Sequence, residues 1–237
     1  MKDPRSRFST KRHLALLTGY AALSVVDTWL SATREDSRAR WVTKPLLMPT
    51  LVAAMTQRPG NSLSGATAVG LVGSWLGDIA LLGKSDKAFL RGMTGFAAAQ
   101  SAYIGAVIPM LDHSRPLTKN PTAKAIVLTS ATLTPGVAIV AGRKDPALGT
   151  AVAAYGALLT GHAAASAHLD AKKLPSSRQR ARLVGSLLFL LSDALIGIRK
   201  FVLPSRPLAL EGAVMGTYTA AQLLISESAR ATTTEQG

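Results

Sequence analysis

The chain has 237 residues, of which 48% are hydrophobic but only 5% aromatic, and its formal net charge is +14. The lack of cysteine excludes thiol catalysis, disulfides and cysteine-ligated metal sites, and the four histidines lack the HExxH spacing of a zinc hydrolase. Lysine and arginine cluster between apolar runs rather than on a basic helix with interleaved aromatics, so nucleic acid is not an expected partner.

The apolar residues form long uninterrupted runs, which predict an integral membrane protein. The first run follows a basic tail, residues 1–12, as in a signal peptide, but it is long and has no convincing cleavage site, so we interpret it as a retained helix. The pattern predicts an all-α fold, a polytopic transmembrane bundle of about eight helices. The predicted spans are residues 13–31, 43–57, 65–83, 88–110, 123–142, 147–169, 181–203 and 207–226.

The connections between the runs are short and polar, so residues 13–226 are predicted to form one domain, followed by a disordered tail at 227–237. An even number of spans puts both termini on one side of the membrane. Slightly more Lys and Arg fall on that side, which favours cytoplasmic termini in a multi-pass protein of the cell membrane. Gly73 and Gly77 form a GxxxG motif, typical of helices that approach closely in lipid. The oligomeric state stays open.

Ionisable residues inside the predicted spans are candidates for function, because an Asp at the centre of a membrane helix costs about 2.5–3.5 kcal/mol. Asp78 lies late in the third span, Asp193 lies just past the middle of the seventh, and Lys44 lies early in the second, which runs the opposite way. They therefore share one half of the bilayer. The same half holds four further charges, namely Asp27, Arg91, Arg199 and Lys200. We infer one polar cavity, with Asp193 and Lys200, seven residues apart, on one helix face.

A purely structural interpretation stays open for each aspartate. Asp78 or Asp193 could pair with a cation or a hydroxyl donor only to set the register of its helix, because structural ion pairs also occur inside bundles. Two acids and several bases at one depth favour a functional site over isolated pairing devices. His162 and His168 are better explained by packing in the core or at the interface.

Four blocks of the sequence carry a family resemblance. They are TKPLLMP (Thr43–Pro49), LGDIALL (Leu76–Leu82), GFAAAQSAYIGA (Gly95–Ala106) and LLFLLSDALIGIRKF (Leu187–Phe201). In order and spacing, over most of the chain, they resemble the YhhN-like, lysoplasmalogenase family of integral membrane proteins. The resemblance implies eight helices and a hydrolase that cleaves the vinyl ether bond of lysoplasmalogens to a fatty aldehyde and a glycerophospho-headgroup.

The resemblance also implies which residues form the site. The acidic positions of the family correspond to Asp78 and Asp193 in this chain, which are the expected catalytic pair. The residues expected to bind substrate are Lys44, Gln100, Tyr103, Arg199 and Lys200. One departure is that Gln100 stands ahead of Tyr103 where family members often carry a histidine. A glutamine side chain can hydrogen-bond a substrate, but it cannot act as an acid or a base.

Two carboxyl groups suit the implied chemistry. An acid protonates the β-carbon of the vinyl ether, water captures the oxocarbenium-like species as a hemiacetal, and the hemiacetal collapses to aldehyde and alcohol. Burial and proximity can keep one carboxyl group protonated while the other stays ionised, and the sequence assigns no order to the two. Cations at the cavity mouth would hold the substrate phosphate. No metal or organic cofactor is expected.

Two other classes of function stay open. A transporter or lipid-binding protein would use the aspartate pair as a proton or cation site, although no inverted repeat or paired broken helices are evident. A structural membrane protein would use the charges only to pair helices. The leading hypothesis is a lysoplasmalogenase-like hydrolase that acts on an ether lysophospholipid and is surrounded by membrane lipids.

Overall fold

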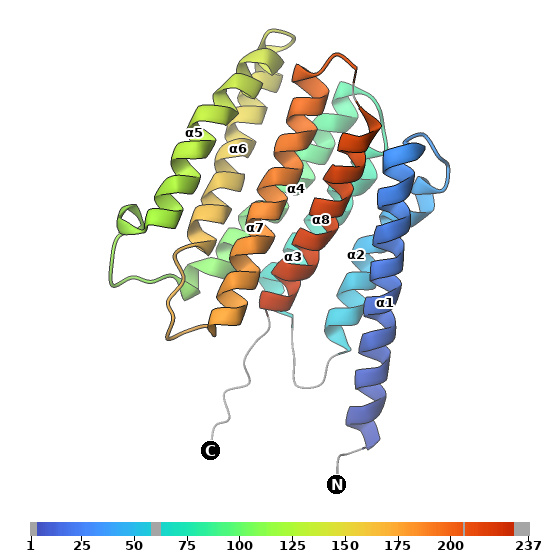
Figure 1. Cartoon of the computed structure of the whole chain (residues 1–237), viewed down its shortest axis with the longest axis vertical. Helices are drawn as coiled ribbons and strands as arrows, with labels where there is room; N and C mark the ends of the chain where they lie inside the picture. The colour runs from blue at the N-terminus through green and yellow to red at the C-terminus, as the bar shows by residue number, and fades with distance from the viewer. Residues whose placement is uncertain (1–3, 58–62, 206, 230–237) are drawn as a thin grey trace.

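The computed structural model describes residues 4–57, 63–205 and 207–229, and in these ranges it confirms the predicted all-α fold (Figure 1). The described residues contain no β-strand, and Leu111 and Leu169 form an isolated β-bridge. Eight α-helices are present in these ranges: α1 Pro4–Thr33, α2 Arg40–Thr56, α3 Gly65–Leu81, α4 Asp86–Val107, α5 Pro121–Gly142, α6 Pro146–Ser166, α7 Ser176–Gly197 and α8 Leu208–Ser228. Three short elements accompany them: the 3₁₀ helices η1 Ile108–Met110 and η2 Leu117–Lys119, and the π-helical turn η3 Ile198–Val202, which extends α7.

Local sequence sets where several helices begin. Ser64 and Ser85 precede α3 and α4, and each hydroxyl accepts a hydrogen bond from a backbone N–H three residues later, at 3.2 and 3.1 Å. Asn120 caps α5 through the N–H of Ala123, and Asp145 caps α6 through the N–H of Ala147, two residues on; a proline occupies the first helical position after each. Such caps satisfy backbone donors that have no partner inside the helix. The short polar connections therefore end one helix and start the next.

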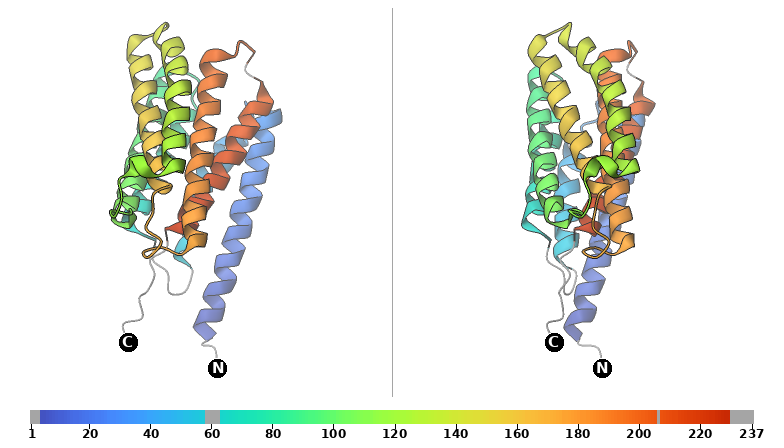
Figure 2. Two further views of the ribbon diagram at one scale, coloured as in Figure 1. Left: turned by 60° about the vertical axis from the view of Figure 1, so that its left-hand side comes forward. Right: turned by 90° about the vertical axis from the view of Figure 1, so that its left-hand side faces the viewer.

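Consecutive helices run in opposite directions, so the bundle has two distinct ends (Figures 1 and 2). The lower end in Figure 1 holds the start of α1 and the end of α8. The upper end holds the connections from α1 to α2, α3 to α4, α5 to α6 and α7 to α8. The pair α5 and α6 lies on one side of the bundle, and α1 and α2 lie on the other. Both described chain ends therefore share one side, as an even helix count predicts.

Close contact between α3 and α4 depends on glycine. A Cβ atom added to Gly73 would lie 2.9 Å from both the carbonyl oxygen of Gly95 and the backbone nitrogen of Ala99. A Cβ atom on Gly95 would lie 2.8 Å from the nitrogen of Gly77. No side chain fits at these distances, so the close approach predicted from the GxxxG motif is confirmed. The next residue after Gly77 is Asp78, which this contact holds in the interior.

The outer surface of the bundle is apolar. Large hydrophobic side chains stay exposed along several helices, among them Val25 at 69%, Leu133 at 64% and Trp41 at 60%. A soluble monomer rarely shows such extensive apolar surface. Four helical segments are long and apolar enough to cross a membrane, namely Ser9–Thr33, Pro121–Gly142, Ser176–Val202 and Leu208–Ser228. The chain is therefore a helical bundle with membrane-protein character.

The structure differs from the predicted spans at several boundaries. Helix α1 begins at Pro4, so most of the predicted basic tail 1–12 is helical, and residues 1–3 lie outside the described part. Of the predicted disordered tail 227–237, the first two residues belong to α8, and residues 230–237 lie outside the described part. Helices α2 and α3 have 17 residues each, which is short for a bilayer. The count of eight membrane spans stays a prediction.

Candidate active site

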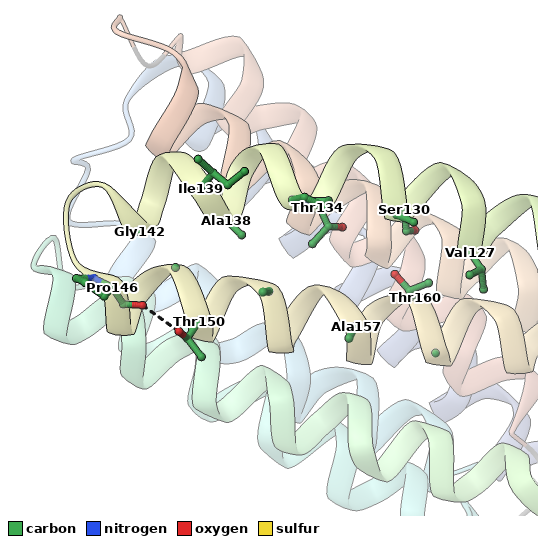
Figure 3. Close-up of a pocket in the computed structure, with 15 residues that line it drawn as sticks. Val127, Ser130, Thr134, Ala138, Ile139, Gly142, Pro146, Thr150, Ala157 and Thr160 are labelled. Atoms are coloured by element: carbon green, nitrogen blue, oxygen red, sulfur yellow. Dashed lines mark hydrogen bonds between the residues drawn. The ribbon is translucent and has the colours of Figure 1, made fainter.

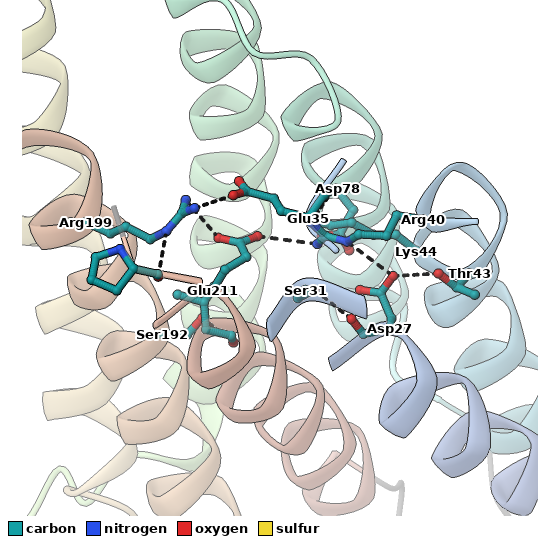
Figure 4. Close-up of polar contacts among 12 residues, drawn as sticks. Asp27, Ser31, Glu35, Arg40, Thr43, Lys44, Asp78, Ser192, Arg199 and Glu211 are labelled. Atoms are coloured by element: carbon teal, nitrogen blue, oxygen red, sulfur yellow. Dashed lines mark hydrogen bonds and ion pairs between the residues drawn. The ribbon is translucent and has the colours of Figure 1, made fainter. Parts of the chain in front are cut away.

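Charged side chains from α1, α2, α3, α8 and η3 converge at the upper end of the bundle (Figure 4). Arg40 joins two acids there: its Nε lies 3.6 Å from Asp27 Oδ1, and its Nη2 lies 3.4 Å from Glu211 Oε1. Asp27 is fully buried and also accepts a hydrogen bond of 2.6 Å from the Thr43 hydroxyl. The charge of Asp27 is thus compensated inside the protein, which favours the structural interpretation for this aspartate.

Asp78 is a buried carboxylate held by donors from two other helices. Lys44 Nζ lies 3.5 Å from Asp78 Oδ1, and the side chains of Lys44 and Asp78 are only 7% and 2% exposed. The hydroxyl of Tyr218, on α8, donates a hydrogen bond of 2.6 Å to Asp78 Oδ2. The structure therefore brings together the acid of α3 and the lysine of α2, the juxtaposition expected from their common depth.

Asp193 has different surroundings. Its carboxylate accepts a hydrogen bond from the hydroxyl of Tyr155 on α6. Among the residues that the structure describes, no Lys or Arg lies within ion-pair distance of it. It borders a small cavity of about 60 Å³ whose other lining side chains are apolar or aromatic: Leu81, Phe89, Met93, Phe96, Val152, Tyr155, Ile196 and Phe201, with Gly197. Asp193 is thus a carboxyl group in an apolar cavity, whereas Asp78 is ion-paired.

The two cations of the π-helical turn also contact acids. Arg199 bonds to Glu35, and its Nη1 lies 3.3 Å from Glu211 Oε2. Lys200 Nζ lies 2.8 Å from Asp86 Oδ1 and 4.6 Å from the centre of the Phe89 ring. Because the α-helical register ends at Gly197, the seven-residue spacing assumed between Asp193 and Lys200 does not apply across η3.

These cations border a polar cleft that adjoins the apolar cavity of Asp193. The cleft has a volume of about 290 Å³. Its charged lining residues are Glu35, Asp36, Lys44, Lys84, Arg199, Lys200 and Glu211. It shares the lining residues Leu81, Phe89 and Ile196 with the cavity. A charged cleft therefore lies next to an apolar space bordered by a carboxyl group, and we take this junction as the candidate active site.

The structure does not bring Gln100 and Tyr103 to this junction. Both are fully buried, and neither lines the cleft or the cavity. Gln100 Oε1 lies 2.8 Å from Nδ1 of His162, and the hydroxyl of Tyr103 donates a 2.7 Å hydrogen bond to Gln222 Oε1. Gln100 and Tyr103 miss the junction because of their position along α4. Phe96 is the last α4 residue that lines the cavity, and both residues follow it toward the lower end of the bundle. Substrate contact is therefore not expected of them in this cleft.

Several residues of the site were not found from the sequence. The two tyrosines, Tyr155 and Tyr218, each hold one aspartate, but buried tyrosines are common core residues and no spacing singles out Tyr155. Glu211 and Tyr218 are seven residues apart on α8 and both point to the site. Because residues seven apart lie on one helix face, this spacing could have identified the two residues together from the sequence. Glu35 lies in the connection between α1 and α2, where an acid is ordinarily solvated.

A larger groove lies between α5 and α6, but it lacks the groups needed for acid–base chemistry (Figure 3). Its volume is about 870 Å³, and its lining is composed of small, aliphatic and hydroxyl residues such as Val127, Thr134 and Thr150, without an ionisable side chain. Among the described residues, no three or more His, Asp or Glu side chains are grouped so that they could hold a metal ion. The junction at the upper end therefore remains the candidate site.

The sequence model of the YhhN family matches residues 39–229. The chain belongs to the YhhN family. The match covers α2 to α8 and so includes Lys44, both site aspartates and the cations of η3, while Asp27 of α1 and Glu35 lie outside it. Comparisons with curated proteins and with solved structures found no match. The resemblance drawn from four sequence blocks is thus confirmed at the level of the family.

Proposed function

We propose that this YhhN-family protein is a membrane-embedded hydrolase that cleaves the vinyl ether bond of lysoplasmalogen-type lysophospholipids to a fatty aldehyde and a glycerophospho-headgroup. The observation that carries the proposal is the junction of the charged cleft with the apolar cavity of Asp193. The charged cleft suits the phosphate headgroup of a lysophospholipid, and the apolar cavity of about 60 Å³ suits the first carbons of its single chain, next to the ether oxygen. The bond to be cleaved lies between headgroup and chain, where the two parts meet.

The proposed setting is the cell membrane, with the chain crossing it several times. The apolar outer surface and the four long apolar helices support this. Cytoplasmic termini, which the distribution of Lys and Arg favours, would put the lower end at the cytoplasmic face. The cleft would then open toward the opposite leaflet, and a lysolipid could enter it from the membrane without crossing water.

The different surroundings of the two aspartates suggest different roles. Asp193 lies in the apolar cavity without a cation, so we assign it the proton that is transferred to the β-carbon of the vinyl ether. Asp78 itself lines neither the cleft nor the cavity, but its ion-pair partner Lys44 lines the cleft. Because Asp78 is paired with Lys44 and bonded to Tyr218, we assign it the ionised form that orients water at the edge of the cleft toward the oxocarbenium-like carbon. Asp78 takes one proton from the attacking water. When the hemiacetal collapses, its C–O bond to the glycerol breaks, the proton on Asp78 passes to the glycerol oxygen, and the hydroxyl proton returns to Asp193 as the aldehyde forms.

The cations of the cleft are proposed to hold the substrate phosphate. Each already contacts a carboxylate, Lys44 through Asp78, Arg199 through Glu35 and Glu211, and Lys200 through Asp86. Phosphate binding would therefore exchange one of these partners for a phosphate oxygen. Arg199 and Lys200 are the better candidates, because their partners Glu35 and Asp86 are 34% and 74% exposed and can turn to solvent.

The test is aldehyde release by the purified protein in lipid nanodiscs. An alkenyl lysophospholipid should give aldehyde, whereas an acyl lysolipid and a diacyl lipid should not. Asp78→Asn and Asp193→Asn should each lower the rate by 100-fold or more, roughly the contribution of a general acid or base. Asp145→Asn is the matched control, because Asp145 is exposed and asparagine is an equally good helix cap. It should keep full activity.

Heavy water tests the chemical step. Protonation on carbon predicts that aldehyde formed in D₂O carries one deuterium at C2, next to the carbonyl carbon. Full activity in either aspartate variant would refute the role of the pair. Absence of aldehyde from every ether lipid, together with proton or cation flux through the protein in liposomes, would favour the transport alternative.

A further inference from the structure

Arg182, on α7, is buried without a partner. Its side chain is only 1% exposed, and none of its Nε, Nη1 and Nη2 atoms has a hydrogen-bond partner among the described residues. No described Asp or Glu forms an ion pair with it. A guanidinium group is always charged, and leaving a buried charge uncompensated typically costs 3–5 kcal/mol. Ionisable residues inside a membrane bundle almost always pair, so the charge of Arg182 calls for a counter-charge.

None of the described side chains around Arg182 supplies that counter-charge, and most offer hydrogen-bond donors; the exception is His162 Nε2, a buried acceptor without a described partner when Nδ1 donates to Gln100. Arg182 is within electrostatic range of Tyr103 and His162, whose rings stack with centroids 5.6 Å apart. His162 and Tyr103 occupy the Oε1 acceptors of Gln100 and Gln222. The Nε2 atoms of both glutamines are buried and have no described acceptor. What remains on these two amides is therefore their donating side.

Two hydroxyl groups extend the set. Ser166 follows His162 by one helical turn on α6, and Ser226 follows Gln222 by one turn on α8. Their Oγ atoms are also buried without a described partner. We call these five residues the Arg182 cluster: Arg182, Gln100, Gln222, Ser166 and Ser226. They come from α4, α6, α7 and α8 and lie toward the lower end, away from the cleft.

We propose that the Arg182 cluster binds one compact anion of the size and charge of chloride. An anion beside the guanidinium neutralises it, which water does not, and it can also accept hydrogen bonds from free amide and hydroxyl donors of the cluster. Tight packing favours a single-atom ion over a phosphate ester. One turn from Arg182, a Cβ atom on Gly185 would lie 3.0 Å from the side chain of Ile225 and 3.1 Å from that of Leu224. The anion would hold four helices together at the lower end, independently of the proposed hydrolysis.

The test is thermal unfolding of the purified protein, followed by tryptophan fluorescence. The protein is first exchanged into sodium gluconate, whose anion is too large for the cluster, and chloride then replaces gluconate at constant ionic strength. The unfolding temperature should rise saturably. At a hundredfold excess of chloride over its dissociation constant, the rise should be roughly 5–10 °C. Phosphate at the same ionic strength should not reproduce it.

Arg182→Met removes the charge while keeping an unbranched side chain, and it should abolish the chloride dependence. Arg180→Met is the matched control, because Arg180 is exposed and should leave the dependence intact. Ser226→Ala removes one donor and should raise the half-maximal chloride concentration several-fold. This variant tests the proposal even if Arg182→Met does not fold. The proposal would be overturned if chloride did not change the unfolding temperature of the wild type, or if phosphate raised that temperature equally. A chloride shift that persists in Arg182→Met would also overturn it.

Discussion

Replacing Lys44 with methionine tests whether Asp78 carries its charge in the folded protein. The two charged atoms are 3.5 Å apart, and the side chains are 7% and 2% exposed. At an effective dielectric constant of about 20, Coulomb's law gives an attraction of about 5 kcal/mol at this distance. Desolvation offsets much of it when the pair forms, but removing only the lysine leaves a buried carboxylate with Tyr218 as its remaining donor. We expect the free energy of unfolding to fall by about 3–5 kcal/mol.

The effect is measured with a double-mutant cycle of Lys44→Met and Asp78→Asn. For a chain of 237 residues, each kcal/mol corresponds to about 2–4 °C, so Lys44→Met should lower the unfolding temperature by roughly 6–20 °C. The double variant has no buried charge at this pair and should regain most of that loss. If Lys44→Met unfolds within about 2 °C of the wild type, or if the double variant is no more stable than Lys44→Met, Asp78 is uncharged. The roles assigned to the two aspartates would then be refuted.

Tyr155→Phe removes the hydroxyl that orients the proposed acid, so kcat for aldehyde release should fall about tenfold, the value of one hydrogen bond, with KM unchanged. Gly73→Ala should lower the unfolding temperature because its Cβ would meet the α4 backbone at 2.9 Å, whereas Gly105→Ala, with nothing within 4 Å, should raise it slightly. The Ser114 hydroxyl, with other donors, lowers the pKa of Asp112, so this carboxylate stabilises the fold above its unfolded pKa and loses that effect as the pH falls through its folded pKa. Asp112→Asn should therefore lower the unfolding temperature at pH 7 but progressively less below about pH 4, as a pH series of melting curves would show.

The helices and the pair of Lys44 with Asp78 could be predicted because both follow from simple geometry. Long apolar runs separated by short polar connections leave an antiparallel bundle as the available arrangement. Once the direction of each helix alternates, the position of a residue within its run gives its depth. Lys44 and Asp78 were placed at one depth in this way, and the structure puts them 3.5 Å apart.

Depth alone does not give the direction in which a side chain points, and several features depended on direction. The hydroxyl of Tyr155 on α6 donates a hydrogen bond to Asp193 on α7, and the sequence periodicity of neither helix predicts this contact. The π-helical turn η3 shifts Arg199 and Lys200 from the face that regular α-helical spacing assigns to them. The burial of Arg182 could not be predicted from the sequence for another reason. Arg182 is the second residue of the predicted span 181–203, where a cation normally reaches the headgroups, but α7 begins earlier, at Ser176, and buries it.

The two ends of the bundle deal with buried charge in different ways. At the upper end every described cation of the cleft, including Lys84 through Asp36, has a carboxylate partner, so the charges there are balanced without a substrate. A phosphate can then bind by exchanging for an exposed acid such as Glu35, and the protein need not hold an unpaired cation in its absence. At the lower end Arg182 has no acid to exchange. The anion that we propose to balance Arg182 would therefore stay bound throughout the proposed reaction, as part of the fold rather than as a competitor of the substrate.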